Sequence, residues 1–349
     1  MVKPKVSYVV AGGFPGGTSS AIAAELRAIQ SVARPSVAVF DCDLFRTGTF
    51  APQLEEVIRR ERLHVAFNPR VVQDDVVILH NPSFLKRNSS FDLQITARHL
   101  IVVTHENFLR PGGFQPYDVA TTLSLIDSGS VALKKTLAPI GPFNRSGVES
   151  WLGSSNGFEH WSCLSDDWFN IFDMQPRPPT QHPRDRRGRV SRSGAEKFPH
   201  IAELDLLFPP QAEANVILGG DHLERFALSR PHWTIHPFRS RPVEDVLSEI
   251  DFFVYFAAPT WRESFGRVIA EAIEAGKLVI TDPETAKPFG KGVVGTAPEE
   301  VSSCIASFIA APDKYVEHVV QAQSDLERYS PEAFRDRFQW IFQLPKLAA

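Results

Sequence analysis

The sequence predicts an α/β protein built from two Rossmann-like domains. Short apolar runs typical of buried parallel strands alternate along the chain with amphipathic helical stretches. This alternation occurs twice, before and after a segment rich in proline and charge, Gln175–Arg187 (QPRPPTQHPRDRR). The length of 349 residues exceeds what one hydrophobic core usually supports and suits two domains.

Composition and charge argue against several classes of protein. A hydrophobic content of 43% with 22% charged residues is typical of a soluble globular protein. The net charge of −4 provides no basic field for nucleic acid, and no apolar run is long enough to cross a membrane. The three cysteines (Cys42, Cys163 and Cys304) are far apart and form no zinc motif. We therefore expect reduced thiols, no export signal and a cytoplasmic location.

The chain opens with a strand, a glycine-rich turn and a helix. Val6–Ala11 is apolar, glycines crowd the turn Gly12–Ser19, and the helix is predicted from about Ser19 to Val32. Glycines let the backbone approach a phosphate closely, but this turn is neither G-x-G-x-x-G nor a P-loop. A plain strand-to-helix turn stays open as the alternative.

A second strand (Ser36–Asp41) and a charged helix (Gln53–Leu63) follow. The strand ends in Asp41-Cys42-Asp43, a D-x-D pair that can ligate a hard cation, although a strand-end aspartate is common in Rossmann-like units. We expect no metal there. The helix carries Arg59, Arg60 and Arg62, which we expect to form a solvated face, with an anionic acceptor or a membrane surface as the alternative.

Two later strands each end in a histidine. Asp75–Pro82 contains His80 and Leu100–Asn107 contains His105, each after an apolar run. Open α/β sheets bind ligands at the carboxyl ends of their strands, so two such histidines indicate a site. A buried structural histidine is the alternative for each. Beyond them we expect a helix (Pro116–Gly129), a strand (Ser130–Leu137) and core aromatic residues: Phe158, Trp161, Trp168 and Phe172.

The second half contains the most informative stretch, Asp251–Asp282. Phe252–Phe256 predicts a buried strand, and Ser264 and Gly276 predict the two ends of the following helix. Leu278–Ile280 predicts the next strand. The same reasoning predicts strands at Ala214–Gly219, Trp233–Pro237 and Gly292–Gly295, and helices at Val243–Ile250, Pro298–Ala310 and Pro331–Phe342.

Two glutamates in this stretch point to ligand chemistry. Glu263 precedes the helix and Glu271 lies within it, at a spacing that turns both carboxylates in nearly the same direction, roughly 12 Å apart if the helix began at Glu263. Between them, the amides of Phe265, Gly266 and Arg267 would form a helix N-terminus that favours an anion. Such a site suits a sugar diphosphate that carries a ribose. A solvated pair on a helix face is the alternative.

The segment Glu263–Glu271 (ESFGRVIAE) resembles the E-x7-E signature of retaining, nucleotide-sugar glycosyltransferases of the GT-B fold, in the family 4-like group. The resemblance implies that Glu263 holds hydroxyls of the donor sugar and that Glu271 holds the ribose. Donor contacts are also implied for the intervening Ser264, Phe265, Gly266 and Arg267. Gly188–Pro199 resembles the family's G-R…K element, which implies that Arg189 and Lys197 clamp the pyrophosphate.

The same resemblance implies further site residues. Gly16 and Gly17 match the glycine pair near the donor's diphosphate, and His105 matches a histidine beside the reacting carbon. His236 and Pro237 would meet the nucleotide base. On the acceptor side the candidates are His80, Asn144 and Arg145.

We therefore expect a GT-B fold whose two domains face one cleft. The expected parts are an acceptor-side domain (1–175), a linker (176–187), a donor domain (188–330) and a helix that returns to the first domain (331–349). The implied reaction is a retaining transfer from a nucleoside diphosphate sugar to a hydroxyl of a glycan, glycolipid or glycoside, as in polysaccharide biosynthesis, without metal or cofactor. One departure is Gly219-Gly220-Asp221, where the family has G-D-G.

Three alternatives remain on the same fold. A nucleotide-sugar epimerase would need no acceptor, and a phosphorylase would carry a lysine-bound pyridoxal cofactor. A non-catalytic subunit would bind the donor without turning it over.

Overall fold

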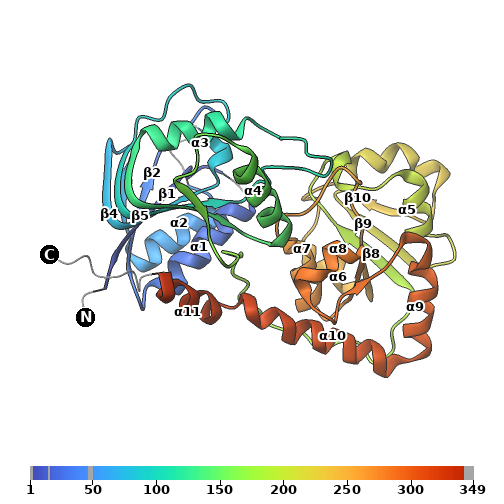
Figure 1. Ribbon diagram of the computed structural model, residues 1–349. Helices are drawn as coiled ribbons and strands as arrows, with labels where there is room; N and C mark the ends of the chain where they lie inside the picture. Colours follow the sequence, from blue (N-terminus) through green and yellow to red (C-terminus); the bar gives the residue numbers. More distant parts are fainter. Residues whose placement is uncertain (1–2, 15, 46–49, 342–349) are drawn as a thin grey trace. The chain divides into compact units, whose positions relative to one another are not determined.

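The computed structural model describes residues 3–14, 16–45 and 50–341. The chain divides into two compact units, which we call unit 1 (Met1–Asp173 and Tyr329–Ala349) and unit 2 (Met174–Arg328). Each unit contains one parallel sheet with helices packed against it (Figure 1). Pro15 of the glycine-rich turn and residues 342–349 of the predicted final segment lie outside the described residues.

The sheet of unit 1 has seven parallel strands in the order β3-β2-β1-β4-β5-β6-β7. The strand order reverses between β1 and β4, which is the switch point of a Rossmann-like sheet. The strands are β1 (Lys5–Val10), β2 (Arg34–Val39), β3 (His64–Phe67), β4 (Val71–His80), β5 (Gln94–Thr104), β6 (Ser130–Pro139) and β7 (Trp161–Cys163).

Helices cover both faces of this sheet (Figure 1). Helices α1 and α2 lie on one face together with α11, whereas α3 and α4 lie on the other. Their bounds are α1 (Gly17–Ile29), α2 (Pro52–Glu61), α3 (Val119–Ser128), α4 (Pro142–Ser154) and α11 (Pro331–Ile341), with a 3₁₀ turn at Pro82–Leu85.

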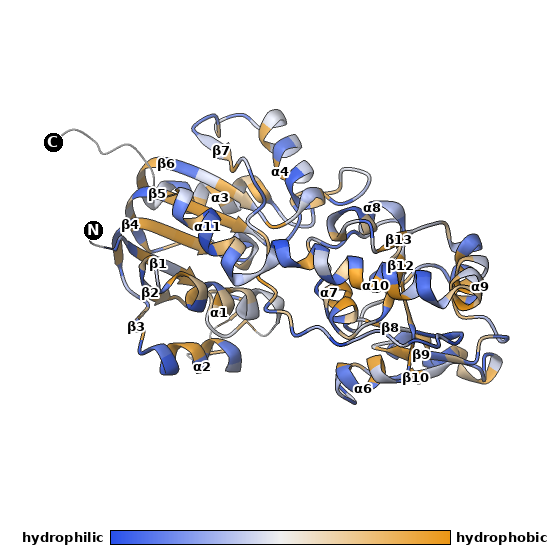
Figure 2. Ribbon diagram, turned by 90° about the horizontal axis from the view of Figure 1, so that it is seen from below, coloured by the Kyte–Doolittle hydropathy of each residue, from blue (hydrophilic) through white to orange (hydrophobic). Residues whose placement is uncertain are grey.

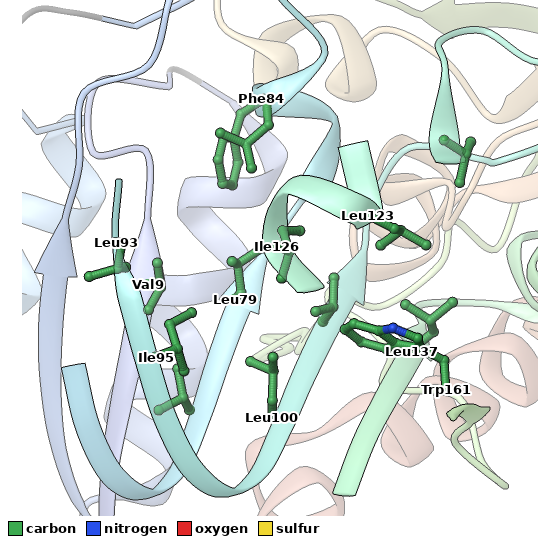
Figure 3. Packing of buried hydrophobic residues seen from close by; sticks show 14 of the residues in the cluster. Val9, Leu79, Phe84, Leu93, Ile95, Leu100, Leu123, Ile126, Leu137 and Trp161 are labelled. Atoms are coloured by element: carbon green, nitrogen blue, oxygen red, sulfur yellow. The ribbon is translucent and has the colours of Figure 1, made fainter. Parts of the chain in front are cut away.

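One hydrophobic core cluster of unit 1 lies between the central strands and α3. Leu79 of β4 and Leu100 of β5 pack in one cluster with Leu123 and Ile126 of α3, and Trp161 of β7 extends it (Figure 3). Figure 2 colours β4 and β5 as hydrophobic along much of their length, which fits strands that are buried on both faces. The two apolar runs that lead to His80 and His105 are therefore neighbouring strands, as predicted, and they lie in the middle of the sheet.

Helix α11 packs against unit 1, as the sequence predicts for the final helix. The Trp168 ring lies 5.3 Å from the Phe334 ring and 6.2 Å from the Phe338 ring. Nε of Arg335 also donates a hydrogen bond of 3.2 Å to the carbonyl oxygen of Ala28 in α1. Trp340, however, is 56% exposed, so only one side of this aromatic helix covers the core.

The sheet of unit 2 has six parallel strands in the order β10-β9-β8-β11-β12-β13. Its order reverses between β8 and β11. The strands are β8 (Arg186–Val190), β9 (Ala214–Leu218), β10 (Thr234–His236), β11 (Phe252–Tyr255), β12 (Leu278–Thr281) and β13 (Val294–Gly295). The helices are α5 (Ile201–Leu207), α6 (Val243–Ser248), α7 (Arg267–Glu274), α8 (Pro283–Ala286), α9 (Val301–Ala310) and α10 (Pro312–Leu326), with 3₁₀ turns that include Ala195–Lys197, Asp221–Ser229 and Pro298–Glu300.

Strand β11 is buried on both faces, as its continuous apolar run predicts. Phe252 and Val254 pack in a cluster with residues of α5, α9 and α10. Phe253 and Tyr255 point to the opposite face, where their rings stack with centroids 6.0 Å apart. Gly276, with φ of 73°, ends α7 in the left-handed conformation that the sequence indicates.

The structure contains elements that the sequence prediction lacks, and it differs at the predicted linker. These elements are the short strands β3 and β7, the helices α5 and α8 and the long helix α10. The last two residues of the predicted linker, Arg186 and Arg187, belong to β8. Arg187 is only 1% exposed, and its Nε donates to Asp185 at 2.7 Å. Its side chain is thus buried in an ion pair and is not part of a solvated linker. Among the described residues, no helix is long and apolar enough to cross a membrane.

Candidate functional site

The candidate site lies at the carboxyl edge of the unit 2 sheet, where the strand order reverses between β8 and β11. Open α/β sheets bind ligands at such a reversal, because the connections after the two strands run in opposite directions. The segment after β8 carries Lys197, the loop after β11 carries Glu263, and these two side chains form an ion pair. The fold thus brings together two residues that the sequence predicts for the site.

Three donors converge on one oxygen atom of Glu263. Its Oε1 accepts from Nζ of Lys197, from Oη of Tyr255 at 2.6 Å and from Nε1 of Trp261 at 3.1 Å. Burial favours a raised pKa, but the charge of Lys197 and the three hydrogen bonds outweigh it and hold the pKa of Glu263 below its ordinary value. Glu263 is therefore an ionised carboxylate whose Oε2 carries none of these bonds.

Two cations lie over the indole ring of Trp261. Nζ of Lys197 is 4.4 Å from the ring centroid and Cζ of Arg192 is 5.3 Å from it. Such stacking is attractive because the face of an aromatic ring carries negative charge density. Lys197 is only 8% exposed, whereas Arg192 is exposed and pairs with Glu196 at 2.7 Å. Arg192 is thus the more accessible cation of this site for an anionic ligand.

Arg189 lacks the exposed surface that a phosphate clamp needs, so this sequence prediction is wrong for the conformation described. The side chain is 0% exposed, and its guanidinium donates to the carbonyl oxygens of Phe256 and Lys197, each at 2.7 Å. The guanidinium also lies between the rings of Phe198 and Tyr255, 4.0 and 4.8 Å from their centroids. Burial lowers its pKa to about 10. Arg189 holds the backbone of Lys197 in place.

Helix α7 begins later than the sequence predicts. Its N-cap is Gly266 and not Ser264, and its first residue is Arg267. Gly266 has φ of 85°, in the left-handed region that favours glycine, and an added Cβ would lie 3.2 Å from the ring of Phe289. Phe265 is buried, and its ring contacts that of Phe289 at 6.2 Å. The backbone amides at the helix N-terminus therefore start at Arg267.

The pKa of Glu271 is shifted in the direction opposite to that of Glu263. Its Oε1 accepts one bond of 3.0 Å from Nε of Arg267, one turn earlier on α7. Burial raises the pKa of Glu271, and the nearby charge of Arg267 only partly opposes this effect. The two glutamates of the predicted pair lie in the same unit and are not bonded to one another in the described structure.

The predicted base contacts lie at the end of β10. His236 is the last residue of this strand and is partly buried, and its Nε2 is 3.2 Å from Nη1 of Arg241. Pro237 follows and is exposed. Since the strands of this sheet are parallel, both residues are at the edge that also carries Lys197 and Glu263.

In unit 1, the predicted residues also follow strands near the switch point. Gly16 and Gly17 are exposed after β1, and Gly16 has φ of 142°, which favours glycine. His105 is partly buried just after β5, and burial, together with the nearby His80, holds its pKa well below the ordinary value. His80 is only 1% exposed, so it does not offer the acceptor-side surface that we expected. Its Nδ1 instead lies 3.0 Å from Nε2 of His105.

The other two acceptor-side candidates are engaged within unit 1. Asn144 is 0% exposed, with Oδ1 accepting from Thr104 at 2.7 Å and Nδ2 donating to Asn107 at 3.0 Å. Arg145 donates from Nε to Asp167 at 2.7 Å. Asn144 is therefore buried and cannot contact a ligand here. It was predicted from its place after a strand, and that place does not reveal that its amide bonds to buried neighbours.

The D-x-D pair lies beside a hollow of about 570 Å³ in unit 1. Its lining includes Asp41, Asp43 and Asp92. Oδ2 of Asp41 accepts a hydrogen bond of 3.1 Å from Asn68. In the described part of the chain, no group of three or more His, Cys, Asp or Glu side chains is placed to hold a metal ion.

The sequence matches no family model and no curated protein, so similarity is detected only in structure. Anabaena HepE, solved in complex with UDP and glucose, has a TM-score of 0.65 at 14% identity, covering 97% of this chain and 99% of HepE. Staphylococcus aureus TarM, in complex with fondaparinux, alpha-GlcNAc-glycerol and UDP, gives 0.64 at 10% identity, covering 97% and 99%. A glycosyltransferase from Rickettsia africae gives 0.57 at 13% identity, covering 98% of each chain. These structures are GT-B proteins.

The chain has the GT-B fold. At these identities the similarity concerns the fold, and it agrees with the fold inferred from ESFGRVIAE. In unit 2, Lys197 and Glu263 follow the two strands at the switch point, and Glu271 lies in the next helix, α7.

Two residues that hold Glu263 were missed at the sequence level. Tyr255 lies within the apolar run of β11 and Trp261 lies in the following loop, and aromatic residues in such positions usually indicate core packing. One signal was present: buried tyrosine and tryptophan need partners for their polar atoms, and Glu263 follows both closely.

Proposed function

We propose that this protein is a glycosyltransferase that moves a sugar from a nucleoside diphosphate sugar to an acceptor hydroxyl, with retention at the anomeric carbon and without a metal ion. The observation that carries the proposal is the ionised Glu263, held by three donors on Oε1 beside Lys197. A fixed carboxylate next to cations suits a ligand that combines hydroxyls with phosphates. Because HepE was solved with UDP and with UDP-glucose, uridine diphosphate sugars are the first donors to test.

Each residue then has a defined contact with the donor. Oε2 of Glu263 accepts from sugar hydroxyls, and Glu271 accepts from the ribose. Lys197 and the exposed Arg192 face the diphosphate, together with the first amides of α7. His236 and Pro237 bound the base. Of unit 1, Gly16, Gly17 and His105 are the residues we assign to the donor, and the acceptor residues are left unassigned.

The proposed reaction exchanges one bond for another at the anomeric carbon. The bond from this carbon to the leaving phosphate oxygen breaks, and a bond to the acceptor oxygen forms on the same face. The acceptor's proton passes to the leaving diphosphate. Negative charge grows on that diphosphate in the transition state, and the nearby cations stabilise it. Because Oε1 of Glu263 is already engaged by three donors, we assign Glu263 to orientation of the sugar and not to nucleophilic attack.

A thermal-shift screen of nucleotides and nucleotide sugars, with and without EDTA, tests the donor site. A ligand at about 100 times its Kd should stabilise the protein by about 2.7 kcal/mol, which is visible as a rise in melting temperature. We expect one family of nucleoside diphosphates to raise the melting temperature whether or not EDTA is present. If no nucleotide shifts the melting temperature, the donor site is wrong. A shift that EDTA removes would instead indicate a metal-dependent site.

A turnover assay with the best donor then separates transfer from the alternatives. Transfer predicts release of the nucleoside diphosphate and a product that retains the donor's anomeric configuration. Conversion of the donor without an acceptor would indicate an epimerase. Binding without any turnover across a panel of glycan, glycolipid and glycoside acceptors would favour a non-catalytic subunit.

A further inference from the structure

A line of buried polar side chains in unit 1 leads from α1 to His105. Glu25 of α1 is 0% exposed and His80 at the end of β4 is 1% exposed. Oε2 of Glu25 lies 3.2 Å from Nε2 of His80, and Nδ1 of His80 lies 3.0 Å from Nε2 of His105. A carboxylate thus reaches the partly exposed ring of His105 through the ring of a buried histidine.

Other buried groups hold this line in place. Nε1 of Trp168 donates a hydrogen bond of 3.0 Å to Oε1 of Glu25. The ring of Tyr8 stacks on that of His80, with centroids 5.5 Å apart and an angle of 13° between the planes. Burial and the charge of Glu25 raise the pKa of Tyr8, so its hydroxyl keeps its proton and is a donor beside the carboxylate.

The contact between Glu25 and His80 fixes where the proton of His80 resides. Oε2 of Glu25, Nε2 of His80 and Oη of Tyr8 are buried, and in the described structure none has an aligned hydrogen-bond partner. The separation of 3.2 Å is nevertheless that of a hydrogen bond. Two acceptors do not stay buried at this distance, so Nε2 of His80 must carry the proton.

We propose that Glu25 and His80 are positioning residues that fix the tautomer of His105. In this arrangement His80 carries its proton on Nε2 and has an acceptor at Nδ1. His105 must then donate from its own Nε2, which leaves Nδ1 of His105 as a hydrogen-bond acceptor. Carboxylates orient the histidine ligands of metal sites in the same manner, through the ring nitrogen that faces away from the ligand.

The consequence for a ligand is that His105 presents a lone pair and not an N–H group. The class of ligand group that fits is a hydroxyl donor. This last step rests on the proposed function, in which the hydroxyl belongs to the donor sugar. The opposite tautomer would present an N–H group to the hydroxyl and remove this acceptor. Glu25 and His80 thus act through His105 without touching the substrate.

Nitrogen-15 NMR of the histidine-labelled protein tests the tautomers without any assay of activity. In the wild-type protein we expect the proton of each ring, His80 and His105, to reside on Nε2. A proton on Nδ1 of either ring would overturn the inference. In the variant Glu25→Met, which lacks an acceptor, we expect His105 to become a mixture of tautomers. Glu25→Gln keeps one acceptor oxygen for two donors, Nε1 of Trp168 and Nε2 of His80, so we expect it to change the tautomers less than Glu25→Met.

Kinetics with the active donor test the consequence. We expect Glu25→Met to lower kcat about tenfold or more while leaving the affinity for nucleoside diphosphate unchanged, and Glu25→Gln to lower kcat less than Glu25→Met does. His99→Gln is the matched control, since His99 is another buried histidine of β5, bonded to Thr136 at 2.8 Å. It should leave kcat within about twofold of wild type.

The outcomes separate this inference from the proposed function. A wild-type protein that transfers no sugar but shows the expected tautomers contradicts the proposed function alone. An active enzyme in which Glu25→Met changes neither the tautomer of His105 nor kcat contradicts the inference alone. If Glu25→Met does not fold, the wild-type tautomers and Glu25→Gln still decide the matter.

Discussion

Nζ of Lys197 and Oε1 of Glu263 form an ion pair in which the same oxygen also accepts from Tyr255 and Trp261. All three of these bonds, in the part of the chain that the structure describes, are made to Oε1 and none of them to Oε2. A ligand can bind Oε2 without breaking the bonds that orient Glu263. The site is therefore preorganised before any donor arrives, which is the condition under which fixed charges assist a reaction most.

Replacing Glu263 by alanine should abolish most of the sugar transfer. We expect kcat to fall about 100-fold to 1,000-fold because the sugar loses its fixed acceptor, while affinity for the nucleoside diphosphate stays nearly unchanged. Steady-state kinetics and calorimetric titration measure the two effects. Glu284→Ala is the control, since Glu284 of α8 forms an exposed ion pair with Lys287 just after this helix. Full activity in Glu263→Ala would refute the assigned role.

The hydroxyl of Tyr255 should matter for activity through Glu263. In Tyr255→Phe one charged hydrogen bond is lost, so we expect the pKa of Glu263 to rise and kcat/KM to fall about tenfold. Tyr315→Phe is the matched control, because its buried hydroxyl donates to the carbonyl oxygen of Asp251 at 2.8 Å. The control should lose about 1 kcal/mol of stability and keep its activity. Equal kinetic losses in both variants would contradict a specific role of Tyr255.

The ionisation of Glu263 should make the folded protein more stable near neutral pH than in acid. Its pKa is lower in the folded protein than the ordinary value of 4.5, so the ionised form contributes stability above that pH. This contribution disappears as the pH falls through the lower, folded value. Melting temperatures should therefore show Glu263→Gln less stable than wild type near pH 7, with a difference that shrinks below pH 4.5.

Glu271 should change the pH dependence of stability in the direction opposite to that of Glu263. Its pKa is raised in the folded protein, so folding favours the protonated form and loses that contribution as the pH rises through the folded value. Glu271→Gln should thus match or exceed the wild-type melting temperature near pH 7. A loss of stability that is the same for both glutamine variants at every pH would show that ionisation is not the cause.

Variants of Arg189 and Arg192 should show different defects: one should lose stability, and the other should lose affinity for the ligand. Arg189→Met leaves the carbonyl oxygens of Phe256 and Lys197 without their donor, so we expect a loss of about 2–5 kcal/mol in unfolding free energy. Arg192→Met should melt like wild type but bind nucleoside diphosphate about tenfold more weakly, because an exposed cation is removed. Denaturation and titration of both variants check this. If neither variant binds nucleoside diphosphate more weakly than wild type, the segment that contains Arg189 and Arg192 is not part of the phosphate site.

The packing of α11 should be essential for unit 1. Phe338 is 1% exposed and contacts Trp168, so Phe338→Ala should destabilise unit 1 by about 3–5 kcal/mol. Trp340→Ala, on the exposed side of the same helix, should change the melting temperature little. Calorimetry of both variants measures the contrast. Similar melting curves for the two would show that α11 contributes little to the core.

Much of the fold follows from local patterns in the chain. The stretch β11–α7–β12 was predicted because each part has its own local pattern: an apolar run indicates the strand, helical spacing indicates the helix, and a glycine indicates the end of the helix. Helix α10 was overlooked although Tyr315, Val319, Ala322 and Leu326 are buried at helical spacing, because its polar face dominates the composition. The short strands β3 and β7 owe their conformation to pairing with β2 and β6, which local patterns do not encode.

The site was harder to predict than the fold. Glu263 and Lys197, which the structure brings into one ion pair, were predicted because a spacing and a short motif mark them. Arg189 was placed at a phosphate because charge in a sequence does not reveal burial, and only tertiary contacts show that its partners are backbone carbonyls. Glu25 resembles any polar position on a helix, and its meeting with His80 depends on the packing of α1 against the sheet.

Helix α11 lies after unit 2 in the chain but belongs to the core of unit 1. During synthesis on the ribosome, unit 2 is therefore complete before unit 1 receives this helix. Until then, Trp168 and the surface of α1 around Ala28 remain uncovered in the nascent chain. Chaperones that bind exposed aromatic surface would act in this interval, and premature termination before Pro331 would release a chain with one finished domain and one prone to aggregation.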